Sequence, residues 1–254
     1  MMKRYVVSIV LMLFMSIQVF AQPETKTNQT DDNGRKQGRW LEKAGEIIMD
    51  GQYQDNLKHG QWLVHFAETG LLSKLETFSM GKKNGIFLEI SKQGYLVSEK
   101  YFINDLPEGP HKVYGQGGFQ VLEKNYKDGK FHGVQITYYE NSKKKSEESY
   151  YSDGVKDGPS KWYNSDGMLI AEYKYVKGML QGEQKSFYSG NKIRTSETYR
   201  DNLNDGPSIE YFENGNVKIS GQYKAGLQDG KWIEYDEQGV IVKTTLYSGG
   251  KEKK

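Results

Sequence analysis

The stretch Gly51-Gln52-Tyr53-Gln54-Asp55-Asn56-Leu57-Lys58-His59-Gly60-Gln61-Trp62 decides the fold, because versions of it return along the chain. We take Gly60 as the anchor of this pattern. Its equivalents lie 22 to 25 residues apart, at Gly38, Gly60, Gly85, Gly109, Gly133, Gly158, Gly182, Gly206 and Gly230. Self-similarity at a fixed period of this length is the signature of a repeat array.

In every repeat from Gly60 onward, the residues seven and four positions before the anchor are each of a fixed chemical type. The residue seven before it is aromatic: Tyr53, Phe78, Phe102, Tyr126, Tyr151, Tyr175, Tyr199 and Tyr223. The residue four before it is Gly, Asn or Asp: Asn56, Gly81, Asp105, Gly129, Gly154, Gly178, Asn202 and Gly226. These three residue types tolerate positive φ, so this position predicts a tight turn.

A second turn is expected about nine residues after each anchor, for example at Gly94, Gly167 and Gly239. Two turns in a 24-residue unit leave segments of roughly six to eight residues, which is the length of a strand. Apolar and polar residues alternate in these segments, as after Gly206 and Gly230. The sequence therefore predicts an all-β protein, in which about nine antiparallel β-hairpins form one long, twisted, open sheet.

The repeated unit resembles a known family. Tyr53 to Trp62 is similar to the MORN repeat, and Tyr126-Lys-Asp-Gly-Lys-Phe-His132-Gly133 is similar to it again. The irregular spacing and the Gly-Pro pairs are closer to the bacterial MORN repeat variant. The resemblance extends from residue 38 to about 250. It implies scaffolding or partner binding; lipid binding has been proposed for some members, and some bacterial relatives carry an antitoxin label.

The N-terminus has the features of a secretory signal peptide. A basic start is followed by an apolar run from Tyr5 to Phe20, which is shorter than the ~20 residues that a membrane-spanning helix needs. We expect residues 1–21 to be removed near Ala21, and the protein to be periplasmic or secreted. Residues 22–37 are predicted to be a flexible linker, 38–250 the repeat array and 251–254 a charged tail.

Charge and cysteine content exclude several classes of protein. The chain has 35 basic and 33 acidic residues, and residues 1–21 contain Lys3 and Arg4 but no acid. The remainder is therefore neutral, which argues against a nucleic-acid partner and against strong attraction to a membrane surface. The chain contains no cysteine, so disulfides and thiolate metal sites are excluded.

The sequence contains no recognisable catalytic or metal-binding motif. His59 and His132 recur at one repeat position, and no two histidines have the spacing of a ligand pair. Residues 115–118 are glycine-rich but lack the Lys-Ser/Thr of a phosphate-binding loop, so we expect a turn there. We therefore predict no enzymatic activity, no catalytic residues, no metal and no cofactor.

Aromatic residues five positions after the anchor form the candidate binding site. They are Tyr114, Tyr138, Tyr163, Phe187, Tyr211 and Tyr235. We expect them to form one ladder across the sheet and call them the stripe. The ladder is either the core of the sheet, with each ring covering a neighbouring strand, or an open groove for a ligand.

These observations predict an exported, non-enzymatic binding or scaffold protein. It would present the stripe to a protein partner, or to a peptide or glycan. The sequence determines neither the identity of this partner nor the oligomeric state. Two alternatives have the same architecture: an antitoxin-type protein that neutralises a partner, and a lipid binder at a membrane surface.

Overall fold

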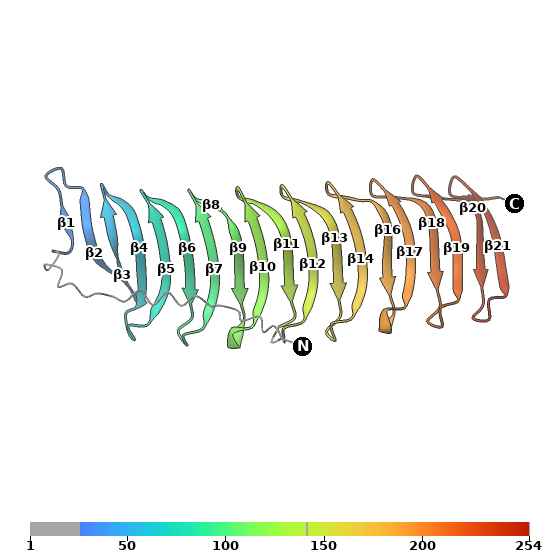
Figure 1. The fold of residues 1–254 in the computed structure, drawn as a ribbon, viewed down its shortest axis with the longest axis horizontal. Coiled ribbons are helices and arrows are strands. Elements are labelled where there is room, and N and C mark those ends of the chain that lie inside the picture. Colours follow the sequence, from blue (N-terminus) through green and yellow to red (C-terminus); the bar gives the residue numbers. More distant parts are fainter. Residues whose placement is uncertain (1–25, 141, 254) are drawn as a thin grey trace, which may run out of the picture.

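One long antiparallel sheet extends through the part of the chain that the computed structural model describes, residues 26–140 and 142–253. Its strands stand side by side in sequence order from β1 (Gln29–Thr30) to β22 (Lys251–Glu252), and the sheet does not close on itself (Figure 1). The predicted all-β array of hairpins is confirmed. The predicted signal peptide, 1–21, lies outside the described residues.

Most strands have six to ten residues, as expected for half of a 24-residue hairpin. The long strands are β2 (Lys36–Ala44), β3 (Ile47–Gln54), β4 (Leu57–Phe66), β5 (Leu72–Ser79), β6 (Lys82–Ile90), β7 (Leu96–Ile103), β9 (Gly109–Tyr114), β10 (Gln120–Lys127), β11 (Lys130–Tyr138), β12 (Lys145–Ser152), β13 (Val155–Tyr163), β14 (Leu169–Val176), β16 (Gly182–Phe187), β17 (Ile193–Arg200), β18 (Leu203–Tyr211), β19 (Val217–Lys224), β20 (Leu227–Tyr235) and β21 (Ile241–Ser248). The short elements are β8 (Leu106–Pro107), β15 (Met179–Leu180) and the 3₁₀ turns η1 (Gln116–Gly118) and η2 (Ser189–Asn191).

The turns along the upper edge of Figure 1 join each repeat to the one before it. The backbone amide four residues before the anchor donates a hydrogen bond to a carbonyl in the preceding repeat, as from Gly226 to Asn204 at 2.8 Å. Where this residue is Asn or Asp, its side chain also accepts a bond. Thus the amide of Leu180 donates to Oδ1 of Asn202 at 2.7 Å.

Most of the anchor glycines lie in β-bulges. Gly60 has φ 70°, and residues 60–62 of β4 stand opposite the single residue Gly51 of β3. A bulge of this kind bends the strand and increases its twist. Extra residues recur at Gly85, Gly133, Gly158, Gly206 and Gly230, so these hairpins are bent at the same level.

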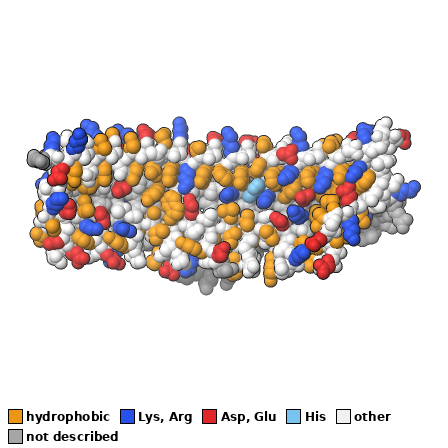
Figure 2. Space-filling model, turned by 180° about the vertical axis from the view of Figure 1, so that it is seen from behind, with side chains coloured by type: hydrophobic (Ala, Val, Ile, Leu, Met, Phe, Trp, Pro, Cys, Tyr) orange, Lys and Arg blue, Asp and Glu red, His pale blue; other side chains and the backbone are white. Residues whose placement is uncertain are grey.

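One face of the sheet carries a ladder of rings, which we call the ring ladder. It consists mainly of the aromatic residues seven before the anchor and those two after it, with Phe131 and the pair Trp162–Tyr173 at other repeat positions, and neighbouring centroids are 4.4 to 6.4 Å apart. Its first members are Trp40, Tyr53 and Trp62. Figure 2 shows a row of hydrophobic side chains along the long axis with basic side chains beside it.

Lysines cover part of the ring ladder. The Nζ of Lys58 lies 4.4 Å from the ring centroid of Trp62 and 5.0 Å from that of Phe78. Lys36 and Lys83 lie over two rings each in the same way. Such cation–π contacts contribute about 0.5–1 kcal/mol at exposed sites, and the lysine stems also shield the rings from water.

Little of the sheet is deeply buried. Among the described residues, the buried hydrophobic side chains are Trp62, Val64 and Trp232, while Ser160 and Ser208 take the ring position in later repeats. A single-layer sheet cannot surround its side chains on all sides. Its stability therefore comes mainly from pairing and packing between adjacent strands.

The two ends of the array differ from the prediction. Within the segment expected to be a flexible linker, 22–37, β1 pairs with β2, and Oδ1 of Asp31 accepts bonds from the amides of Asn33 and Arg35. These bonds, together with the nearby Arg35 guanidinium, lower the pKa of Asp31 to about 2. At the other end, Lys251 and Glu252 of the expected tail form β22 and pair with β21.

Candidate functional site

The stripe residues lie near the lower ends of β9, β11, β13, β16, β18 and β20, and all are half-buried. They project from the face opposite the ring ladder. Trp162 belongs to the ring face, where it contacts Tyr173, and the next side chain along a strand, Tyr163, points to the other side. We call this second surface the stripe face.

The rings of the stripe residues do not contact one another directly. No ring–ring contact within residues 26–140 and 142–253 joins two stripe residues. Its members are two strands apart, about 9–10 Å, which is beyond ring contact. The strands between them supply the missing neighbours.

Aliphatic side chains fill the stripe in its C-terminal half. Tyr163 pairs with Leu169, Phe187 with Ile193, Tyr211 with Val217 and Tyr235 with Ile241. Directly opposed residues on paired strands share a face. The result is a mixed row of aromatic and aliphatic side chains from β13 to β21, and Ile241 at its end is 55% exposed.

A row of alternating charges runs beside the stripe in the middle of the array. Cross-strand partners follow one another as Glu99, Lys112, Glu123, Ile136, Glu148, Lys161, Glu172 and Lys185. Lys161 and Glu172 form an ion pair of 3.4 Å, and Lys145 binds Glu148. Opposite charges at opposed positions stabilise a sheet.

The charge row changes the acidity of the nearest stripe tyrosines. Partial burial raises the pKa of Tyr114, and the carboxylates of Glu99 and Glu123 raise it further. Burial and Glu123 also raise the pKa of Tyr138, while Lys145 acts in the opposite direction. Both phenols therefore remain protonated at neutral pH and can donate a hydrogen bond.

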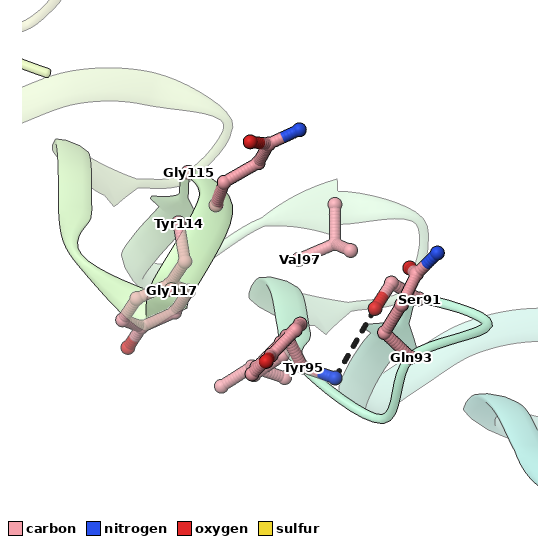
Figure 3. A pocket seen from close by; sticks show the side chains of 9 residues that line it. Ser91, Gln93, Tyr95, Val97, Tyr114, Gly115 and Gly117 are labelled. Atoms are coloured by element: carbon pink, nitrogen blue, oxygen red, sulfur yellow. Dashed lines mark hydrogen bonds between the residues drawn. The ribbon is translucent and has the colours of Figure 1, made fainter. Parts of the chain in front are cut away.

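Two adjoining hollows lie at the lower edge of the sheet, between successive turns. The first, of about 530 Å³, is lined by Ser91, Gln93, Tyr95, Leu96, Val97, Tyr114, Gly115, Gln116 and Gly117 (Figure 3). The second, of about 500 Å³, is lined by Tyr114, Gly117, Gly118, Phe119, Gln120, Tyr138, Ser142 and Lys143. Tyr114 and Gly117 belong to both, so the hollows share a wall.

The shared wall is built by the turn that contains η1. The amide of Gly115 donates to the carbonyl of Phe119 at 2.8 Å, and Gly117 and Gly118 both have φ 77°. Residues 115–118 thus form a turn, as predicted. The opposite wall of the first hollow is fixed by Ser91, whose Oγ accepts a bond from the amide of Tyr95 at 3.1 Å (Figure 3).

The structure therefore places two of the six stripe residues, Tyr114 and Tyr138, in the lining of these hollows. Sequence reasoning missed Tyr95, Gln116 and Phe119 as their neighbours. The signal was present in the run 115–118, because glycines at successive positions allow a turn that differs from those of most other repeats. Tyr95 directly follows the turn residue Gly94.

The described residues contain no group of three or more His, Asp or Glu side chains placed to hold a metal ion. Within the same ranges, no helix has the length and apolar character that crossing a bilayer requires. The two hollows can bind a ligand through rings, amides and hydroxyls, and the residues that line them include no pair of side chains placed for acid–base chemistry.

Comparison with known proteins addresses the repeats themselves. Segments 131–154, 156–177, 204–225 and 228–248 match the family described as MORN repeat variant. No curated protein matches the chain. The four matched segments contain ring-ladder aromatics, and each extends across a lower turn to the edge of the next upper turn. These four segments are therefore repeats of the MORN repeat variant family.

Proposed function

We propose that this chain is an exported, non-enzymatic binding protein that presents its stripe face to a protein partner. The observation that carries the proposal is the mixed aromatic and aliphatic row from Tyr163 to Ile241, which lies on one face of a single-layer sheet. No second layer covers this face in the described part of the chain. Repeats of this family commonly act in binding or scaffolding.

The surface has the composition of a protein interface. Tyr163, Phe187 and Tyr211 offer large rings, which are enriched in interface centres, and the row of paired charges beside them resembles a polar rim. A repeat array also gives an extended contact area without a deep pocket. Export is proposed from the signal-peptide features of residues 1–21.

Capture of partners from envelope fractions tests the proposal. The bait is the mature chain, compared with Tyr211→Ser/Tyr235→Ser. The control is Leu203→Ser/Leu227→Ser, which removes exposed apolar side chains of the same repeats from the upper edge. We expect a protein that is retained by the wild type and the control and lost with the stripe variant, while thermal unfolding of all three stays cooperative.

Two results would contradict the proposal. Equal capture by the stripe variant and the control would show that the stripe face is not the interface. Retention of lipid vesicles in place of a protein would favour a membrane-surface function. Co-purification with the product of a neighbouring toxin gene would identify the partner and support the antitoxin form of the same binding function.

A further inference from the structure

We propose that the two hollows at the lower edge form adjacent subsites for a neutral oligosaccharide. This goes beyond the proposed function, because the hollows lie around residues 91–143 and the mixed row begins at Tyr163. Each hollow has a volume within the range of about 300–1,000 Å³ that is usual for small-ligand sites.

The lining is depleted of charge. Charged residues make up 27% of the chain, yet Lys143, at the far end of the second hollow, is the one charged residue that lines either hollow. Glu99 and Glu123 stand next to Tyr114, where they oppose an anionic ligand. A phosphorylated or carboxylated ligand would therefore lose the hydration of its charge without gaining an ion pair in the first hollow, whereas an uncharged ligand does not incur this larger cost.

The polar groups that do line the hollows suit a ligand rich in hydroxyls. Gln93, Gln116 and Gln120 each offer both donors and acceptors, and Ser91 and Ser142 add hydroxyls. A sugar hydroxyl also both donates and accepts, so these side chains can satisfy it without a change of protonation state.

Rings supply the apolar part of the site. Tyr95, which is 51% exposed, and Tyr114 line the first hollow, and Phe119 and Tyr138 line the second. The C–H-bearing face of a pyranose ring is apolar and packs on aromatic faces, while the tyrosine hydroxyls remain available for hydrogen bonds. Both hollows thus combine the two kinds of contact that a sugar ring requires.

The spacing of the hollows indicates a polymer. Successive lower turns are two strands apart, about 9–10 Å, and this is close to the length of a disaccharide. A linear oligosaccharide could fill both hollows across Tyr114, whereas a monosaccharide fills only one. Binding should therefore strengthen from monosaccharide to tetrasaccharide.

An extended peptide is the less suitable ligand. Peptides often bind to a repeat sheet by adding a strand to a free edge. The long strands around the hollows, β6, β7, β9, β10 and β11, are paired on both sides, so they offer no such edge.

Titration calorimetry of the mature chain tests the proposal. The probes are linear neutral tetrasaccharides of hexoses and of N-acetylhexosamines, the corresponding disaccharides and monosaccharides, and a tetrasaccharide of hexuronic acid. We expect a neutral tetrasaccharide to bind more tightly than its disaccharide, and the uronic acid to bind more weakly. Failure of every neutral tetrasaccharide to bind, or tighter binding of the uronic acid, would overturn the proposal.

The repeats provide matched variants that locate the site. Gln93 and Gln238 hold the same position in equivalent turns, but only Gln93 lines a hollow. Gln93→Ala should weaken binding about tenfold, and Gln238→Ala should leave it unchanged. Tyr95→Val, which introduces the residue that the chain has at the equivalent Val240, should also weaken binding.

The outcomes separate this site from the protein interface. Equal affinity of the Gln93 and Gln238 variants would exclude the hollows as the binding site. Capture of a protein partner through Tyr211 and Tyr235 does not depend on Gln93. Loss of oligosaccharide binding in the Gln93 variant, with partner capture retained, would therefore support the proposal by itself.

Discussion

The indole of Trp62 occupies the space into which a side chain on Gly51 would project. A Cβ built on Gly51 would lie 2.2 to 2.5 Å from three ring atoms of Trp62. The same relationship holds between Gly221 and Trp232, at 2.2 to 2.7 Å. A glycine and a tryptophan eleven residues later thus form one packing unit in two repeats.

Gly51→Ala should destabilise the protein by about 1–3 kcal/mol, because the added methyl group overpacks the contact with a ring that is fully buried. Chemical denaturation measures this change.

A double mutant identifies the cause. Once Trp62→Ser has removed the ring, Gly51→Ala should add almost no further destabilisation, which gives a large coupling energy between the two sites. Additive effects would show that Gly51 is required for its backbone and not for the space that it leaves.

Asn202→Gly should destabilise the protein by about 1 kcal/mol, because the amide of Leu180 loses its bond to the Asn202 side chain. The reverse change is available in a neighbouring repeat. Gly178 has φ 84°, close to the φ 68° of Asn202, so Gly178→Asn can gain the corresponding bond. Thermal melts of both variants check the pair, and destabilisation by both would contradict this explanation.

His111 should make stability depend on pH. It lies in the ring ladder between Phe102 and Tyr126, with Nε2 2.9 Å from the carbonyl oxygen of Tyr101. Burial lowers the pKa of His111, so the folded protein favours the neutral ring. This contribution is complete above the unfolded pKa of about 6.5 and is lost as pH falls through the folded pKa.

Urea denaturation at about one pH unit above and below 6.5 measures the effect. His111→Phe introduces the ring found at the equivalent Phe87, and the part of the pH dependence that comes from His111 should disappear. An unchanged pH dependence would assign it to other groups.

Tyr199 should resist ionisation. Burial raises the pKa of Tyr199 to about 12, helped by Glu197, whose carboxylate accepts a bond from the phenol at 3.1 Å. The folded state therefore favours the neutral phenol. Its contribution to stability is complete below the unfolded pKa of about 10 and is lost as pH rises through about 12.

Spectrophotometric titration of tyrosinate, by difference from Tyr199→Phe, measures this pKa. Glu197→Gln should lower it but leave it above 10, because burial is the larger cause. A Tyr199 pKa at the ordinary value in the wild type would contradict the described environment.

The sequence alone was sufficient for the hairpins and their order. Gly226 and Asn202 marked the upper turns correctly because few residue types adopt positive φ. Period-two alternation then set the strands. The turn residues and the alternation are both local features, so they can be read from one segment of sequence without knowing which strands lie beside it.

The faces of the sheet could not be predicted in the same way. The role of Gly60 as a bulge, with residues 60–62 opposite Gly51, depends on cross-strand register, which single-strand alternation does not reveal. Tyr114 and Tyr138 could therefore be assigned to one ladder, but the edge-to-face contact of Tyr53 with Trp62 on the other face could not be predicted. The hollows depend on how two turns lie side by side, so Tyr95 could not be connected with Gln116 from spacing.

The bond from each upper turn to the preceding repeat also bears on how such a protein can change its length. The amide of Gly226 and the carbonyl of Asn204 belong to adjacent repeats, and so do the amide of Gly178 and the carbonyl of Lys156. Duplication or deletion of a whole 24-residue unit in the gene therefore gives every remaining donor a new acceptor of the same kind. Recombination could thus lengthen or shorten the array while leaving each junction intact.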